Sequence, residues 1–192
     1  MSKLEDAERL ELPSRPAWGA WLTEHHDHST GAWLRIDDRS APGEDALSYE
    51  NAVLEALCWG WIDGQTRTEG PASLIWFSPR RRGSPWAASN KARLELLAAQ
   101  GRMQPAGIAL VEAAKVDGSW TVLDGPEAGI EPPGLTEALD AAPPARSFWD
   151  ALPPSARKYA LTQVATAKRP ATRASRIERI VQRCAAEERP DR

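Results

Sequence analysis

The sequence has few cysteines and no long hydrophobic run. Only Cys58 and Cys184 occur among 192 residues, without a Cys-x-x-Cys pair, which excludes a disulfide framework and a cysteine zinc ribbon. No stretch approaches the roughly 18 consecutive apolar residues that a membrane-spanning helix requires. Residues 1–16 carry mixed charges and no apolar segment of signal-peptide length. We therefore expect a cytoplasmic protein with reduced thiols.

Histidine is equally scarce, because all three histidines lie within residues 25–28. A contiguous cluster at a helix end cannot easily direct three ligands at one ion, whereas a helix C-terminus favours imidazolium. Cys58 has no histidine in its own motif, so a buried structural thiol is favoured over a nucleophile. We expect neither a bound metal nor a cofactor.

Tryptophan is abundant, with nine residues against two phenylalanines and two tyrosines. A buried indole needs a partner for its N–H, so these rings indicate either an ordered core or a ring-lined groove, and core packing is favoured. Charge is distributed unevenly. Residues 143–192 hold 11 Lys/Arg and 5 Asp/Glu, a net +6, which leaves −9 on the rest of a chain of net −3. The tail either binds an anionic partner or attracts the acidic part of its own chain.

The periodicity predicts an α+β fold followed by an all-helical extension. Apolar spacing predicts a helix from Pro16 to His26, a strand at 31–36 and a helix that starts at Ser48 and ends at Gly60 in a left-handed cap. A β-hairpin and further helices follow. The hairpin strands are predicted at 61–68 and 74–77, the helices at 84–100, 105–118, 135–141, 145–152, 154–167 and 170–186, and an extended segment at 120–123. The predicted divisions are a charged flexible leader (1–13), an α+β core with a small antiparallel sheet (14–123), a Pro/Gly-rich linker (124–134), a helical region (135–187) and a disordered tail (188–192).

Asp63 is the first candidate for chemistry. It follows the predicted glycine cap in the segment 56–65 (ALCWGWIDGQ), where it is constrained beside Gly64. An Asp-Gly pair is common in turns, where the carboxylate accepts backbone or arginine hydrogen bonds. A turn residue and a site residue are equally favoured.

Three consecutive arginines, 80–82, lead into the predicted N-terminus of a helix. Free N–H groups and the helix dipole favour an anion there, with Ser84 as cap and Trp86 as a stacking surface. A solvated arginine loop before a capped helix is the simpler interpretation. The predicted ligand-binding residues are Trp61, Asp63, Arg67, Arg80, Arg81, Ser84, Trp86, Asn90 and Lys91.

The last predicted helix carries a basic stripe opposite an apolar face. The stripe lacks interleaved aromatic residues and the chain is acidic overall, so a nucleic acid is the less favoured partner and docking on the chain's own acidic part is preferred. The residues proposed for phosphate or partner contact are Lys168, Arg169, Arg173 and Arg176.

These segments resemble the YdeI/OmpD-associated family, also called bacteriocin-protection proteins. The resemblance extends over about residues 14–183 and rests on 47–50 (LSYE), 56–64 (ALCWGWIDG), 77–81 (FSPRR), 101–107 (GRMQPAG) and 167–173 (AKRPATR), with Ser84, Trp86, Asn90, Lys91 and 176–177. The family commonly has Phe at Trp59 and Ser at Ala87, which puts a serine role at position 87 in doubt. The resemblance implies a YdhG/frataxin-like layout with a helical extension, and a link to bacteriocin and cationic-peptide resistance. It implies no reaction.

Three functions follow from these residues. The favoured one is a non-enzymatic binding protein that holds a small anion or an acidic protein segment between the strand after Gly60 and the arginine loop. The second is an enzyme that uses Asp63 as general base in the same pocket. The third is nucleic-acid binding through the basic C-terminal helix.

Overall fold

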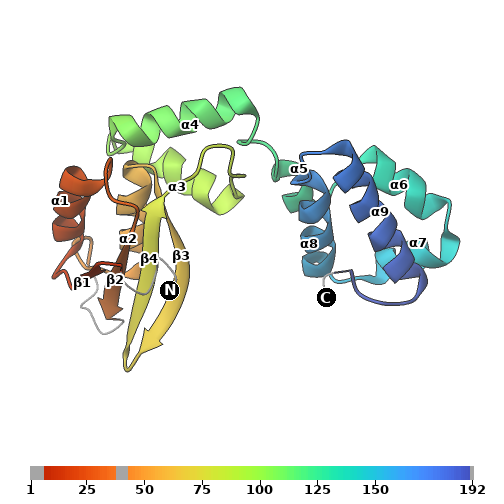
Figure 1. Ribbon diagram of the computed structural model, residues 1–192, viewed down its shortest axis with the longest axis horizontal. Helices are drawn as coiled ribbons and strands as arrows, with labels where there is room; N and C mark the ends of the chain where they lie inside the picture. The colour runs from red at the N-terminus through yellow and green to blue at the C-terminus, as the bar shows by residue number, and fades with distance from the viewer. Residues whose placement is uncertain (1–6, 38–42, 191–192) are drawn as a thin grey trace. The chain divides into compact units, whose positions relative to one another are not determined.

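The computed structural model describes residues 7–37 and 43–190, which divide into two compact units (Figure 1). The N-terminal unit comprises the described residues up to 84 together with 90–116. The C-terminal unit comprises 85–89 and the described residues from 117 onward. The fold class is α+β, as predicted, because every strand found among the described residues lies in the first unit and the second is helical.

A four-stranded mixed sheet and four helices make up most of the N-terminal unit. The elements are β1 (Arg9–Leu10), α1 (Arg15–His25), β2 (Ala32–Asp37), α2 (Tyr49–Cys58), β3 (Trp61–Glu69), β4 (Ala72–Pro79), α3 (Ala88–Ala99) and α4 (Pro105–Asp117). The strand order is β1-β2-β4-β3, and β1 is parallel to β2 while the other pairs are antiparallel. The predicted helices of this unit, the predicted strand at 31–36 and the predicted hairpin are therefore confirmed, except that the helix predicted from Ser84 begins at Ala88. The sheet is mixed rather than wholly antiparallel.

Side-chain caps explain where α1 and α2 begin. The hydroxyl of Ser14 accepts from the N–H of Ala17, and that of Ser48 accepts from the N–H of Asn51. Gly60 has φ +77°, the left-handed conformation predicted for the residue that follows α2. The cap turns the chain directly into β3, and this turn positions Asp63.

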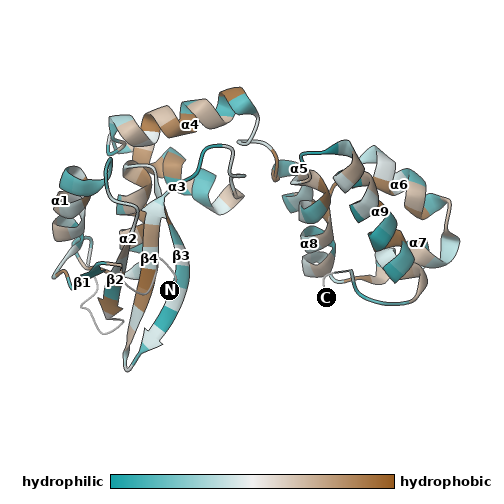
Figure 2. Ribbon diagram, viewed as in Figure 1, coloured by the Kyte–Doolittle hydropathy of each residue, from teal (hydrophilic) through white to brown (hydrophobic). Residues whose placement is uncertain are grey.

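The two hairpin strands differ in polarity because they occupy different places in the sheet. Figure 2 shows hydrophobic residues along much of β4 and hydrophilic residues along β3. β4 lies between β2 and β3, with Leu74, Ile75 and Phe77 buried, whereas β3 is an edge strand whose middle is exposed. Polar side chains on an edge strand disfavour pairing with a second chain.

Three predicted segments differ in the structure. Strand β1 lies within the predicted flexible leader, where Arg9 pairs with Trp33 in register and Leu10 is buried. Residues 120–123 form turns instead of an extended segment. The stretch 124–134, predicted as a linker, begins with helix α5 (Asp124–Glu127). Strand β1 and helix α5 form through pairing and packing with segments distant in sequence, which local composition does not reveal.

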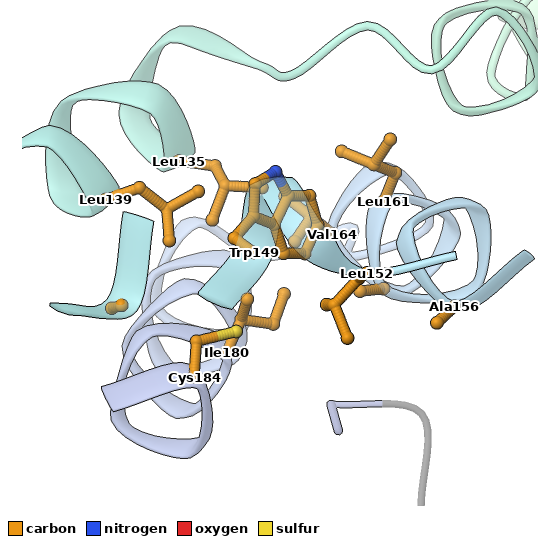
Figure 3. Packing of buried hydrophobic residues seen from close by; sticks show 11 residues of the cluster. Leu135, Leu139, Trp149, Leu152, Ala156, Leu161, Val164, Ile180 and Cys184 are labelled. Carbon is orange, nitrogen blue, oxygen red and sulfur yellow. The ribbon is translucent and has the colours of Figure 1, made fainter. Parts of the chain in front are cut away.

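The described residues of the C-terminal unit form five helices. They are α5, α6 (Pro133–Asp140), α7 (Pro143–Ala151), α8 (Pro154–Ala165) and α9 (Pro170–Ala185). Each of the last four has a proline at the start of its first turn, where the missing N–H costs no hydrogen bond. Figure 3 shows the core that these helices share, with Trp149 of α7 close to leucines of α6 and to Ile180 and Cys184 of α9.

The tryptophans are mainly core residues. Five of the nine have at most 2% of their surface exposed, namely Trp18, Trp33, Trp61, Trp86 and Trp149. Among the residues that the structure describes, no helix is both long and apolar enough to span a bilayer.

Candidate functional site

Asp63 lies near the start of β3 and holds a specific partner. The hydroxyl of Tyr49, in the first turn of α2, donates to its carboxylate over 2.7 Å. Burial and this hydrogen bond raise the pKa of Tyr49 to about 12. The phenol therefore keeps its proton at neutral pH and acts as a donor, not as a base or nucleophile.

Arg80 is brought next to Asp63 by the pairing of β3 with β4. Trp61 is in register with Pro79, and the N–H of Arg80 donates to the carbonyl of Gly60 over 3.0 Å. The guanidinium is half-buried, and burial lowers the pKa of Arg80 while the nearby charge of Asp63 opposes that shift. Asp63 is thus close enough to Arg80 to act on its charge, while the predicted ligand pocket between the strand and the arginine loop stays a prediction.

An ion pair between Arg93 and Glu50 lies near Asp63. Arg93 of α3 donates to both carboxylate oxygens of Glu50, at 2.8 and 2.6 Å, and to the amide oxygen of Asn90 at 2.9 Å. Glu50 first, and then Tyr49 and Asp63, raise the pKa of Arg93. We call Tyr49, Glu50, Asp63, Arg80 and Arg93 the Asp63 cluster.

Sequence reasoning missed three members of this cluster. Glu50 and Arg93 are 43 residues apart, and no spacing rule links them. Tyr49 offered a weak signal, since it is one of two tyrosines and directly follows the predicted cap Ser48.

The arginine loop forms a tight turn instead of a helix cap. The N–H of Ser84 donates to the carbonyl of Arg81 over 3.2 Å, and Gly83 has φ +72°. Arg80 donates to the carbonyl of Ser84 over 3.4 Å. Arg81 and Arg82 are exposed at this turn. The prediction that Ser84 caps α3 is wrong, because the helix begins at Ala88.

The predicted aromatic walls are core residues. Trp61 is 1% exposed, packs against Trp18 and Trp21, and donates through Nε1 to the carbonyl of His26 over 3.1 Å. Trp86 belongs to the C-terminal unit, where its ring packs against Trp120 with centroids 5.5 Å apart.

The remaining predicted residues of the N-terminal unit have separate environments. Arg67 places its guanidinium 4.4 Å from the ring centroid of Trp33. Lys91 lies half-buried on α3, one residue after Asn90. Neither position tests the predicted ligand contacts, which stay predictions.

The start of α3 already receives a carboxylate from the chain itself. The N–H of Ala88 donates to Glu127 over 2.7 Å, and Lys158 donates to the other oxygen of that carboxylate over 3.2 Å. Ala88 and Glu127 both belong to the C-terminal unit, so the attraction of this N–H for an anion is satisfied within that unit.

The basic residues of α9 separate into exposed and structural ones. Lys168, Arg169 and Arg173 are exposed. Arg176 donates to the carbonyl of Gln163 and to the Thr166 hydroxyl, so it ties α9 to the end of α8. Nucleic-acid binding through this helix stays a prediction.

The histidine cluster is held by α1 and its neighbours. The ring of His25 stacks on Trp21 with centroids 4.5 Å apart, and that of His26 lies 4.4 Å from Trp59. One nitrogen of each ring lies within hydrogen-bonding distance of a carbonyl one turn earlier. His28 pairs with Asp27. The rings of His25 and His28 also lie near each other, with centroids 5.4 Å apart.

Both thiols are expected to be unreactive in the folded protein. Burial raises the pKa of Cys58 and of Cys184 to about 11, and each is at most 1% exposed. Titration with a disulfide reagent at pH 8 should therefore be slow under native conditions and should release two equivalents in urea. Rapid native labelling of Cys58 would contradict its structural role.

Comparison with known families divides the chain along similar lines. Residues 10–110, more than half of the chain, match the family model described as a domain of unknown function (DUF8412). The chain belongs to this family. Residues 129–187 match a second model, described as Bacteriocin-protection, YdeI or OmpD-Associated, which is the family that the sequence resembles. Comparisons with curated proteins and with solved structures found no match.

The two matches also locate the resemblance. The motifs 47–50, 56–64, 77–81 and 101–107 lie within the first matched range, and 167–173 lies within the second. The Asp63 cluster therefore belongs to the part of the chain matched by the family of unknown function.

Proposed function

We propose that this protein is a non-enzymatic binding protein for a small anion or an acidic protein segment, which it holds at Arg80 and the exposed Arg81. The observation that carries the proposal is the half-buried guanidinium of Arg80 in electrostatic reach of Asp63, with its pKa lowered by burial. A cation that has lost part of its hydration gains more from an added anion than a fully solvated one.

The proposal gives different tasks to the members of the Asp63 cluster. Asp63 accepts a hydrogen bond from Tyr49, and its negative charge acts on Arg80. Arg93 is neutralised by Glu50 and braces α3 against α2. Arg81 and Arg82 add positive charge at the rim. This division favours binding over general-base catalysis, because the Asp63 carboxylate already accepts a hydrogen bond from Tyr49 of the same chain.

The expected result is that Arg80→Ala weakens phosphate binding at least about tenfold, which is the loss expected for one charge-assisted hydrogen bond. Tryptophan fluorescence can follow titrations with inorganic phosphate, a nucleotide and an acidic peptide. Arg81→Ala tests the same surface at an exposed position. The matched control is Arg9→Ala, which removes the same charge from the opposite edge strand.

Asp63→Asn separates the binding and enzyme hypotheses. Its carboxylate competes with an added anion for Arg80, so the variant should bind phosphate as tightly as the wild type or more tightly. Circular dichroism checks that each variant is folded. Equal phosphate affinity in the wild type, Arg80→Ala and Arg81→Ala would reject the proposal.

The family name matched at residues 129–187 refers to bacteriocin protection. We propose this as the physiological setting of the binding activity, together with a cytoplasmic location. Sensitivity of a deletion strain to bacteriocins, with complementation by wild type and by Arg80→Ala, tests whether the arginine turn contributes to such protection.

A further inference from the structure

A cavity of about 330 Å³ lies within the C-terminal unit, next to α8. Its volume is at the lower end of the range for small-molecule sites, about 300–1,000 Å³. The lining is mainly aliphatic with two charged residues, and among the described residues that form it none is aromatic. Its apolar side chains include Val122, Pro126, Ile130, Leu161, Val164 and Ala165.

One side of the cavity is rigid and another is exposed. Leu161 and Val164 are at most 1% exposed and belong to the packed core, where Figure 3 shows them on α8. Ile130, which precedes α6, is 62% exposed. A bound aliphatic chain would therefore cover Ile130 and gain hydrophobic free energy without disturbing the core.

The two charged side chains that line the cavity differ in whether they already have hydrogen-bond partners. Glu131 accepts from both terminal nitrogens of Arg146, from the indole of Trp149 and from the hydroxyl of Thr136. Arg173 is exposed on the first turns of α9, and within the described part of the chain its side chain makes no hydrogen bond or ion pair. The cavity thus offers an apolar wall and one uncompensated guanidinium.

We propose that this cavity binds a medium-chain aliphatic carboxylate. The hydrocarbon chain lies against Leu161, Val164 and Ile130, and the carboxylate pairs with Arg173. A planar guanidinium matches a carboxylate in a two-bond arrangement, and the aliphatic lining offers no ring for stacking a planar ligand. This site is independent of the anion site at Arg80, which lies in the other unit.

Isothermal titration calorimetry of the full chain with octanoate tests the proposal, with octanol and octylammonium as probes of the head group. We expect saturable binding of octanoate, and binding at least about tenfold weaker for both other probes, because each lacks the charge-assisted bond to Arg173. Arg173→Ala should weaken octanoate binding by a similar factor. Arg179→Ala is the matched control, since Arg179 is exposed on the same helix and does not line the cavity.

A second variant tests the cavity itself. Ala165→Leu places extra methyl groups in the space that the ligand would occupy, and it should reduce octanoate affinity while the circular dichroism spectrum is retained. The proposal is overturned if octanoate gives no saturable signal, if octanol binds equally well, or if Arg179→Ala weakens binding as much as Arg173→Ala does. Unchanged octanoate affinity in folded Ala165→Leu would overturn it as well.

Discussion

Gly107→Ala is expected to destabilise the N-terminal unit by about 3 kcal/mol, as for a strongly overpacked core site. A Cβ atom at this position of α4 would lie 2.2 Å from the carbonyl oxygen of Cys58 and 3.0 Å from that of Leu57. Both atoms belong to the backbone of α2, so no side-chain rotation relieves the contact. Helix propensity alone predicts the opposite sign, a gain of about 1 kcal/mol.

The effect of this substitution should reach the Asp63 cluster. The carbonyl of Cys58 also accepts from the N–H of Gln104 over 3.0 Å, so the residue before α4 is hydrogen-bonded to the last residue of α2. Gly60 follows directly and passes the chain into β3, and its carbonyl accepts from Arg80. Moving α4 away from α2 would shift Gly60, and with it the start of β3 that carries Asp63 and the backbone bond to Arg80.

Pulse-labelling hydrogen exchange in a urea series measures this loss for each unit separately, which suits a chain of two units. The matched control is Gly134→Ala in α6, where the nearest atom to a Cβ is the flexible Cδ1 of Ile177 at 3.6 Å. It should stabilise the C-terminal unit by about 0.4–1 kcal/mol. If the N-terminal unit of Gly107→Ala unfolds at the same or a higher urea concentration than that of the wild type, α4 does not approach α2 as closely as described.

The N-terminal unit shows what sequence patterns can and cannot predict. Helices α1 and α2, the Gly60 cap and the hairpin were predictable because their signals are local: a serine cap, apolar spacing and glycine at a positive φ. β1 was not predictable, because two residues in a charged segment become a strand only through pairing with β2.

The start of α3 was predicted too early for a related reason. Ser84 followed by Pro85 is a strong local signal for a helix start. In the structure Trp86 is buried against Trp120 and the N–H of Ala88 is satisfied by Glu127, both contacts with residues distant in sequence. These long-range contacts outweigh the local preference and delay the helix.

The candidate site was predictable only in part. Asp63 and Arg80 were identified because one is constrained after a glycine cap and the other lies in a run of arginines. Tyr49 and Arg93 reach the cluster through packing of α2 and α3, which no local pattern encodes. Conversely, Trp61 and Trp86 were expected at a ligand because large rings suit stacking, yet both rings were needed for the core.

Glu131→Gln is expected to destabilise the C-terminal unit by about 2–3 kcal/mol at neutral pH, because a partly buried charged hydrogen-bond acceptor is lost. Both oxygens of Glu131 are occupied, with Arg146 at 2.7 and 3.0 Å and the indole of Trp149 at 2.8 Å. The NH₂ group of a glutamine is itself a hydrogen-bond donor, so it would face the N–H donors of Arg146 or Trp149 without an acceptor between them. Glu137→Gln in α6 is the matched control, an exposed glutamate in the same unit, and should change stability by less than about 0.5 kcal/mol.

The pH dependence of this loss follows from the direction of the Glu131 shift. Arg146 first, and also Trp149 and Thr136, hold the pKa of Glu131 below its ordinary value. A lowered folded-state pKa gives stability that is complete above the unfolded value, about 4.3, and that is lost as pH falls through the folded value. Urea denaturation should therefore show a constant gap between wild type and Glu131→Gln from pH 6 to 8, which narrows below about pH 4.5. If the stability difference between wild type and Glu131→Gln widened in acid, the ionised form of Glu131 would not be what stabilises the contacts with α6 and α7.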